Sequence, residues 1–442
     1  MKCENAYTFK LKNKMKNSLA FMMFLMVVFT LSCTSGKHAG GQQITLTNTA
    51  NIKLSNKAIT IKRAELSQLP AGDKFPLLLA EAGDTIPAQL NDLDGDQQWD
   101  ELFFVTNLAA NKATTIQLKW IDAPAIFTKR TNVRFGVRPV LDSKVSPADS
   151  ATFYPDQLPG VIGYQHFQTD GPTWENDKVG FRLYFDGRNS VDVFGKKVAY
   201  MTPQNVGINA AGVTEANYSA MQDWGTDILA VGNSVGIGGI SFMIGDSLAR
   251  LGVTEKDSIN NVDSTHFQIV ANGPEKSIMK FTYNGWRPMN RDYFVQTTTS
   301  IWPGIYAFNN QVICKNLKDD ETLLVGLVNS NTDHAVTEMN INDKWVALFT
   351  HDKQAVDKQW WLGLALVLPK DTYLGYIEAP KTGSLSTTFL GKLKIENNKP
   401  VNYFAIAAWE LSDEQFKDST YFKNYVSNFA DQQAAEVTVT IE

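Results

Sequence analysis

The chain has 442 residues, enough for two average domains or for one very large β-structure. It carries 46 acidic and 41 basic residues, a net charge of −5, and no run of basic residues, which argues against a nucleic-acid partner. Of its three cysteines, Cys3 and Cys33 lie at the N-terminus and only Cys314 lies in the body of the chain, which excludes a disulfide framework.

The N-terminal residues have the pattern of a secretory signal. Lysines precede an apolar run from Leu19 to Leu31, which is too short to span a bilayer and is followed by a serine and Cys33. The end of this run resembles a bacterial lipobox, which implies that Cys33 is acylated. We therefore expect a lipoprotein signal peptide over residues 1–32, a flexible tether over residues 33–43, and a protein of the periplasm or outer membrane whose only membrane contact is its lipid anchor.

Strand signals dominate the rest of the chain. Segments of β-branched or alternating residues, separated by turn residues, predict a small N-terminal β-unit over residues 44–125 and a larger β-region over residues 126–442. A clear helical pattern occurs near the C-terminus, where four apolar residues recur at helical spacing: Phe422, Tyr425, Val426 and Phe429. The sequence therefore predicts an all-β, antiparallel protein with a short C-terminal helix.

The segment NDLDGDQQWDEL has four aspartates at a spacing similar to that of calcium-binding loops: Asp92, Asp94, Asp96 and Asp100. It departs from the EF-hand, because glycine falls between the second and third carboxylates and the last ligand position has no glutamate. A turn whose aspartates accept backbone N–H groups is favoured, with a calcium site as the alternative. No other cofactor is indicated.

A glycine-rich stretch, GNSVGIGGISF, contains Gly232, Gly236, Gly238 and Gly239. It lacks the lysine that ends a phosphate-binding loop, and strand signals follow it instead of a helix. We therefore expect the glycines to serve tight packing between strands.

The segment between Gly163 and Gly195 carries the strongest functional signal. In FRLYFD, apolar residues alternate with Arg182, Tyr184 and Asp186, so a strand would direct these polar side chains to one side. We expect five polar side chains to converge in one concave cleft: Tyr164, His166, Arg182, Tyr184 and Asp186. For each residue alone, the alternative is a solvated sheet face with an Arg–Asp cross-strand pair.

Several loops in the larger region place tryptophan beside polar residues, as in QDWGTD and NGWRPMNRDYF. Aromatic platforms edged by charged and amide groups suit sugars, although tryptophan is often simply buried. Three loops are therefore expected to complete the cleft with the following residues: Trp224, Asp227, Trp286, Arg287, Arg291, His351 and Gln354. Arg287 and Arg291 could clamp an anionic group or form surface salt bridges.

Long stretches of the chain, among them LNDLDGDQQWDELFFVTNL, GPTWENDKVGFRLYFDGRNSVDVFGKK and YFVQTTTSIWPGIYAFNNQV, resemble domain-of-unknown-function family 4861. The resemblance implies an exported Bacteroidota protein associated with polysaccharide degradation. It also implies a galactose-mutarotase-like supersandwich, a fold shared by polysaccharide lyases and glycoside hydrolases. A shared fold does not establish an activity, and the resemblance transfers no catalytic residues.

Three functional hypotheses follow, all with an oligosaccharide or polysaccharide as the partner. The first is a lyase acting by β-elimination at a uronate, with His166 or His351 as the base, Tyr184 as the acid, and Arg182, Arg287 or Arg291 as the cation. The second is a glycoside hydrolase that uses Glu175 and Asp177, or one of these with Asp186 or Asp227. The third is a glycan-binding lipoprotein without catalysis.

Overall fold

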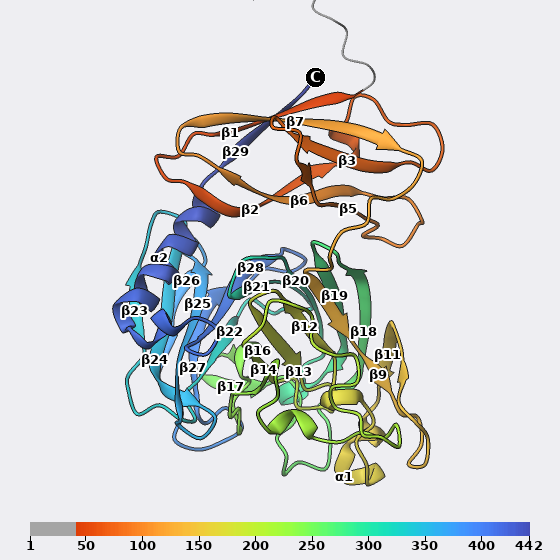
Figure 1. Cartoon of the computed structure of the whole chain (residues 1–442). Coiled ribbons are helices and arrows are strands. Elements are labelled where there is room, and N and C mark those ends of the chain that lie inside the picture. The colour runs from red at the N-terminus through yellow and green to blue at the C-terminus, as the bar shows by residue number, and fades with distance from the viewer. Residues whose placement is uncertain (1–40) are drawn as a thin grey trace, which may run out of the picture. The chain divides into compact units, whose positions relative to one another are not determined.

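The computed structural model describes residues 41–442, which are built mainly from antiparallel strands (Figure 1). The expected signal peptide, Cys33 and nearly all of the tether lie outside the described residues. Across residues 41–442, no helix is both long and apolar enough to cross a membrane. The predicted all-β, antiparallel architecture is confirmed.

The N-terminal region forms a small sandwich of two sheets. One sheet has the order β29 (Val437–Ile441), β1 (Gln42–Asn48), β7 (Lys112–Ile121), β3 (Phe75–Ala80) and β4 (Thr85–Ile86). The other has the order β2 (Leu54–Lys62), β6 (Glu101–Leu108) and β5 (Ala88–Asn91). Alternate residues of β1 point inward, so Ile44 and Leu46 are buried between the two sheets.

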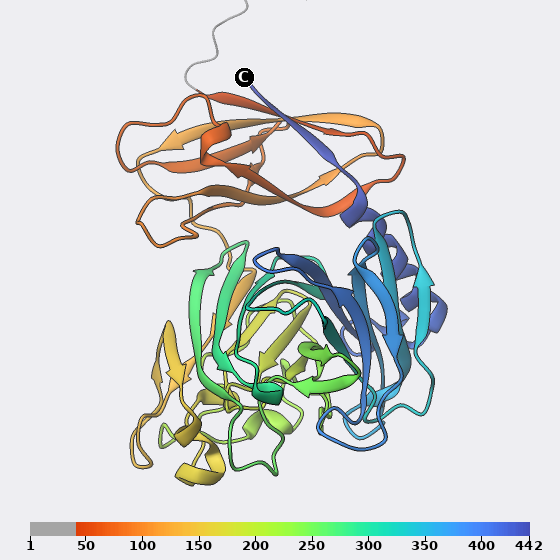
Figure 2. The ribbon, with the colours of Figure 1, turned by 180° about the vertical axis from the view of Figure 1, so that it is seen from behind.

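The C-terminal strand β29 belongs to the N-terminal sandwich. It pairs antiparallel with β1, with Ile441 opposite Ile44 and Val437 opposite Asn48. Figures 1 and 2 show this strand running from the end of the C-terminal helix to the sheet that contains β1. The first and last described strands are thus neighbours, whereas the domain boundary at residue 125 stays a prediction.

The larger region is a supersandwich built on a nine-stranded sheet. That sheet has the order β11 (Ser150–Phe153), β18 (Val262–Asn272), β19 (Ser277–Trp286), β20 (Tyr293–Ile301), β21 (Ala307–Lys315), β28 (Val401–Trp409), β25 (Trp360–Pro369), β24 (Trp345–Ala355) and β23 (Thr337–Asn340). A two-stranded sheet of β10 (Ser146–Pro147) and β9 (Gly136–Val137) precedes it in the chain.

Two five-stranded sheets pack on the nine-stranded sheet. The first has the order β15 (Gly225–Asp227), β14 (Val191–Lys196), β13 (Val179–Leu183), β12 (Thr173–Asn176) and β8 (Thr131–Arg134). The second has the order β17 (Ser247–Arg250), β16 (Ile237–Ile244), β22 (Glu321–Val328), β27 (Thr388–Lys394) and β26 (Tyr373–Ile377). They meet where Val191 and Gly236 form a parallel bridge.

The helices are short, apart from the predicted C-terminal one. α2 (Ser419–Ala434) begins after Asp418, whose carboxylate accepts the backbone N–H groups of Thr420 and Tyr421. Its buried stripe includes Phe422, Val426 and Phe429, as the spacing predicted. The other helical segments are α1 (Pro159–Ile162), η1 (Arg63–Glu65), η2 (Pro155–Gln157), η3 (Gln168–Asp170), η4 (Asn217–Ser219), η5 (Pro288–Asn290) and η6 (Glu414–Lys417).

The glycine-rich stretch serves tight packing between strands, as expected. Gly236 has a φ of +78°, and a Cβ there would lie 1.7 Å from the backbone oxygen of Val191. Gly239 is equally confined, because its Cβ would lie 2.0 Å from the oxygen of Val235. The close approach at Gly236 is what allows the two five-stranded sheets to meet.

We predict that Gly236→Ala lowers the free energy of unfolding by about 3 kcal/mol or more, because both the backbone conformation and the contact with Val191 oppose a side chain. Gly72→Ala is the matched control, since Gly72 has a φ of +76° but a Cβ there would meet no atom within 4 Å. Denaturant unfolding of both variants measures the difference. Equal losses would show that the sheet contact contributes nothing.

Candidate active site

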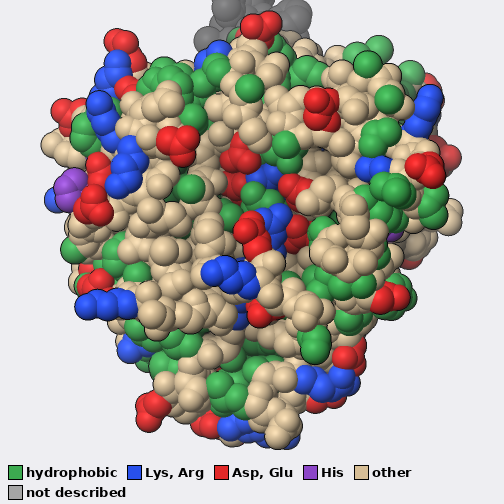
Figure 3. All heavy atoms as spheres, turned by 90° about the horizontal axis from the view of Figure 1, so that it is seen from below, with side chains coloured by type: hydrophobic (Ala, Val, Ile, Leu, Met, Phe, Trp, Pro, Cys, Tyr) green, Lys and Arg blue, Asp and Glu red, His purple; other side chains and the backbone are tan. Residues whose placement is uncertain are grey.

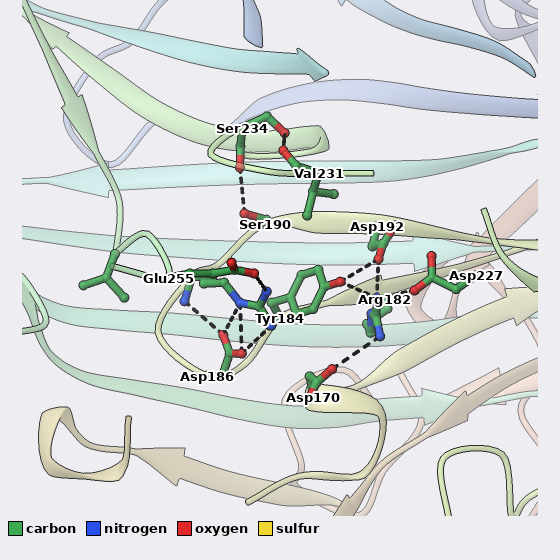
Figure 4. A network of polar contacts seen from close by, with 12 residues as sticks. Asp170, Arg182, Tyr184, Asp186, Ser190, Asp192, Asp227, Val231, Ser234 and Glu255 are labelled. Atoms are coloured by element: carbon green, nitrogen blue, oxygen red, sulfur yellow. Dashed lines mark hydrogen bonds and ion pairs between the residues drawn. The ribbon is translucent and has the colours of Figure 1, made fainter. Parts of the chain in front are cut away.

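A fully buried arginine lies at the centre of the main polar network. Arg182 is 1% exposed, and its Nη2 lies 2.7 Å from Asp227 Oδ2 and in close contact with Asp192. Its Nη1 lies 3.6 Å from Asp170 Oδ2. Figure 4 shows the three carboxylates reaching the guanidinium from different sides. One cation therefore holds together acidic residues from β14, β15 and η3.

The register of the β13–β14 pair explains the first of these contacts. Arg182 and Asp192 are directly opposite each other, with Leu183 paired to Val191. The expected alternation is present, but the polar side of β13 is buried instead of solvated, because both Arg182 and Asp192 are covered. A buried guanidinium is stable only when its charge is compensated, and the surrounding carboxylates meet that need.

Tyr184 links this arginine to a second one. Its ring lies under both guanidinium groups, with the Cζ atoms of Arg182 and Arg188 at 4.2 Å and 3.6 Å from the ring centre. Its hydroxyl donates to Asp192 at 3.0 Å and accepts from Arg182. Arg188 is itself held by Asp186 through bonds of 2.6–3.1 Å. Burial raises the pKa of Tyr184 well above its usual value, so the phenol stays protonated.

Asp227 is the network's acid near neutral pH. Burial and the neighbouring Asp192 carboxylate raise the pKa of Asp227 to about 7, against the opposing effect of Arg182. Its side chain is nevertheless 18% exposed. A second carboxyl group, Asp170, also has a raised pKa, mainly because of burial. Buried carboxyl groups with raised pKa values are typical of acid–base catalytic sites.

Two hollows border this network through Asp186, Arg188 and Asp170, although Arg182 and Asp227 line neither of them. One has a volume of about 220 Å³ and is lined by Asp186, Arg188 and the loop that contains Glu255. The other has a volume of about 160 Å³ and is lined by Asp170 and Tyr218, whose hydroxyl donates to Asp170 at 3.0 Å. Gln165 lines both, so they meet there. Figure 3 views the protein from the α1 side and shows acidic and basic side chains gathered in a central hollow.

Four residues expected from the sequence belong to this network, Arg182, Tyr184, Asp186 and Asp227, and of these only Asp186 lines one of the two hollows. Tyr164 and His166 line neither hollow. Tyr164 donates to the oxygen of Pro139, and His166 is buried with its ring against Phe167. Burial lowers the pKa of His166, which opposes its protonation. The intervening residue Gln165 reaches the hollows instead.

The two expected tryptophan platforms are core residues, which corrects the prediction. Trp286 is 1% exposed and packs on Phe242, while Trp224 is 4% exposed and packs on Phe194. The arginines near Trp286 form ion pairs at the surface instead of a clamp in the cleft. Arg287 pairs with Asp263 and Arg291 with Asp320 and Glu321.

His351 and Gln354 lie on β24 of the nine-stranded sheet, away from the two hollows. The ring of His351 stacks on Trp361 and its Nε2 lies 2.7 Å from the oxygen of Phe416. Gln354 is buried and donates to the oxygen of Leu362 at 2.8 Å. Both residues therefore lie outside the arrangement around Arg182, and His351 lines a separate hollow of about 360 Å³ instead.

The carboxylates of Glu175 and Asp177 serve the fold instead of hydrolysis. Glu175 is buried and pairs with the fully buried Lys196 at 2.6 Å. It also accepts two bonds from Thr202. Asp177 pairs with Arg130 at 2.7 Å and accepts from the backbone of Gly304. Neither carboxylate is available to a substrate, because its oxygens are already bound.

The aspartate loop has the features of the favoured turn. Asp92 accepts from the backbone of Gly95 and Gln97, and Asp96 accepts from that of Gln98. Carboxylate oxygens of Asp92, Asp94 and Asp100 nevertheless lie within 4.8 Å of one another. Calcium at this loop stays a prediction.

Sequence reasoning missed several members of the network: Asp170, Tyr218, Arg188, Asp192 and Gln165. The turn residues DGRN between β13 and β14 could have revealed Asp192, because a tight hairpin centred there places it opposite Arg182. No comparable signal existed for Asp170 or Tyr218, which come from the short helical turns η3 and η4.

Fold and site together define a β-supersandwich protein with a buried acid–base network. The chain belongs to the family described as Domain of unknown function (DUF4861), whose model matches residues 46–439. It is 23% identical over 448 residues to "Uncharacterized protein P7" of Formosa agariphila, a match that covers 95% of this chain and 99% of that protein.

Two solved structures are also similar. An alpha-mannosidase from Enterococcus faecalis V583 and a protein in the Glycosyl Hydrolase Family 38 from Enterococcus faecalis each match at a TM-score of 0.46 and 10% identity. The matches cover 91% of this chain but only 46% and 47% of those chains. This chain therefore spans less than half the length of either protein.

We predict that Asp227→Asn changes how stability depends on pH. A folded-state pKa of about 7 lies above the unfolded value of 3.8, so the stability that proton binding gives is present below pH 4 and is lost as the pH rises to 7. The unfolding midpoint of Asp227→Asn minus that of the wild type should therefore increase by several degrees between pH 5 and pH 8. Asp223→Asn, at an exposed aspartate just before β15, should show no such trend.

We predict that Glu175→Gln destabilises the protein by about 3–5 kcal/mol, because it leaves the buried Lys196 ammonium without a carboxylate. Glu436→Gln, which removes an exposed pair with Lys344, should have little effect. Chemical unfolding at pH 7 compares the two. A stable Glu175→Gln protein would contradict the structural role given to this residue.

Proposed function

We propose that the protein is a carbohydrate-active enzyme that cleaves a glycosidic bond of a neutral oligosaccharide by acid–base catalysis at the carboxyl groups around Arg182. The observation that carries the proposal is Asp227, a partly exposed carboxyl group with a pKa of about 7. A group with this pKa can both give and accept a proton near neutral pH.

A second carboxyl group lies within catalytic reach. Asp170 and Asp227 contact different nitrogens of the same guanidinium, which keeps their nearest oxygens within roughly 9 Å of each other. Glycosidases use carboxyl pairs separated by about 5–5.5 Å or about 6.5–9.5 Å. The arrangement around Arg182 is therefore compatible with either class, and Asp170 lines a hollow large enough to admit part of a sugar.

The charge of the cleft favours a neutral substrate over a uronate. Elimination at a uronate needs a cation free to neutralise the sugar carboxylate. Arg182 and Arg188 are already paired with acidic residues of the fold. The first hollow is further lined by Glu255 and Asp257, so an anionic sugar would meet net negative charge. The hydroxyl groups of a neutral sugar, by contrast, could donate hydrogen bonds to the carboxylate oxygens of the same cleft.

In this proposal each residue has a distinct role. Protonated Asp227 donates its proton to the glycosidic oxygen as the bond to the anomeric carbon breaks. Asp170, as a carboxylate, stabilises the positive charge that develops on the sugar or activates the attacking water. Arg182 is a positioning residue, because it fixes both carboxyl groups. Tyr184 holds Arg182 and Asp192 in place through its hydroxyl.

We predict that the purified protein releases reducing ends from at least one neutral oligosaccharide in a panel of mannan, galactan and glucan fragments. Asp227→Asn should lower kcat by about 100-fold or more, because general acid–base catalysis contributes a factor of that size. Asp223→Asn, at an exposed aspartate just before β15, should keep wild-type kcat. The pH dependence of kcat/KM should show an inflection near pH 7 that Asp227→Asn removes.

Three outcomes would contradict the proposal. Pectic, alginate or ulvan oligosaccharides that yield unsaturated products absorbing in the ultraviolet would establish a lyase. Binding of oligosaccharides without turnover across both panels would establish a binding protein. An Asp227→Asn variant that retains the wild-type kcat and pH profile would remove Asp227 from the reaction.

A further inference from the structure

A third hollow, chemically different from the two acidic ones, lies between α2, the start of β2 and the loop at Gly304. It has a volume of about 250 Å³ and none of its lining residues is charged. We call it the amide groove, because its lining residues include five with carboxamide side chains: Asn56, Asn424, Asn428, Gln432 and Gln433. These side chains are neutral hydrogen-bond donors and acceptors, so a ligand of this groove would differ chemically from a ligand of the charged cleft.

The spacing along α2 aligns three of these amides. Asn424, Asn428 and Gln432 are four residues apart, so they lie in one row on the same side of the helix. Asn424 and Asn428 are exposed, and their side chains make no hydrogen bond to any residue in the range 41–442. Gln433, beside this row, likewise has no partner there. These amides are therefore free to bind a ligand.

The opposite wall is held in place by contacts with α2. Gln432 Oε1 accepts the backbone N–H of Ser55 at 2.7 Å. Lys57 Nζ donates to the backbone oxygens of Gln432 and Ala435 at 2.6 Å and 2.9 Å. Direct hydrogen bonds between β2 and the end of α2 therefore fix the width of the groove.

Asn56 is positioned unusually at this wall. Its φ is +50°, and its side chain lies against Gly304, where a Cβ would be 2.3 Å from the Asn56 Cγ. Only glycine at position 304 leaves room for this carboxamide. Conformations of this kind cost free energy and often occur where a side chain must be presented to a ligand.

We propose that the amide groove binds a neutral sugar unit of an oligosaccharide. Carboxamides donate and accept hydrogen bonds at once, which matches the hydroxyl groups of a pyranose ring. The half-buried rings of Tyr421 and Tyr425 line the groove and supply an apolar surface for its C–H groups. An ionised sugar would find no counter-charge among the lining residues. The proposal does not depend on catalysis in the cleft.

The test is calorimetric titration of the full chain, in the Asp227→Asn background to prevent turnover, with maltotriose, cellotriose, mannotriose and trigalacturonate. At least one neutral trisaccharide should bind, and trigalacturonate should bind at least tenfold more weakly at this site. The double variant Asn424→Ala, Asn428→Ala should lose this site or weaken it at least tenfold. If the cleft also binds the sugar, the parent protein should bind two sugar molecules and the double variant only one.

Lys423→Ala is the matched control, because Lys423 is exposed on the same helix but lines a different hollow. It should leave the affinity and the number of sites unchanged. Circular dichroism and the unfolding midpoint confirm that each variant is folded. The proposal is overturned if no neutral trisaccharide binds, or if the double variant binds as the parent does. If the wild-type protein cleaves no oligosaccharide, the proposed activity is contradicted, but the proposal of a sugar-binding site in the amide groove is not.

Discussion

The buried Arg182 guanidinium is the interaction on which the candidate site depends. Transferring this cation from water to the interior is costly, and the cost is offset only while acidic partners remain in contact. Asp192 comes from the neighbouring strand, Asp227 from the next strand and Asp170 from a short helical turn. The same electrostatic requirement that stabilises the arginine thus collects carboxyl groups from separate segments of the chain.

This arrangement also explains why one carboxyl group is protonated near neutral pH. Arg182 Nη2 faces both Asp192 and Asp227, and a single positive charge cannot fully compensate two buried negative ones. Asp192 has the additional hydrogen bond from Tyr184. Asp227 lacks that bond and carries the raised pKa. Shared compensation by one guanidinium therefore accounts for the raised pKa of Asp227.

The structure has two candidate binding sites of opposite character. The cleft lies beside strands β13 and β14 and is rich in charge, whereas the amide groove lies beside α2 and has only neutral lining. The tryptophans expected to serve as sugar platforms, Trp224 and Trp286, line neither hollow and are buried in apolar clusters. Their large apolar surface is covered, because packing against the sheets stabilises the protein more than exposure to solvent would.

The sequence by itself determined the strand-dominated architecture, the helix at Ser419–Ala434 and the need for glycine at Gly236, since these depend on local periodicity and on backbone conformation. It also identified Arg182, Tyr184, Asp186 and Asp227 as residues of one region, because strand parity and nearby polar loops are visible along the chain.

Only the tertiary structure decided which other groups join them. The alternation of polar and apolar residues along β13 does not reveal that the polar side of this strand is buried. It also does not reveal that Glu175 pairs with Lys196. Asp170 and Tyr218 reach Arg182 from short helical turns whose position depends on long-range packing, and no local pattern in the sequence encodes that position.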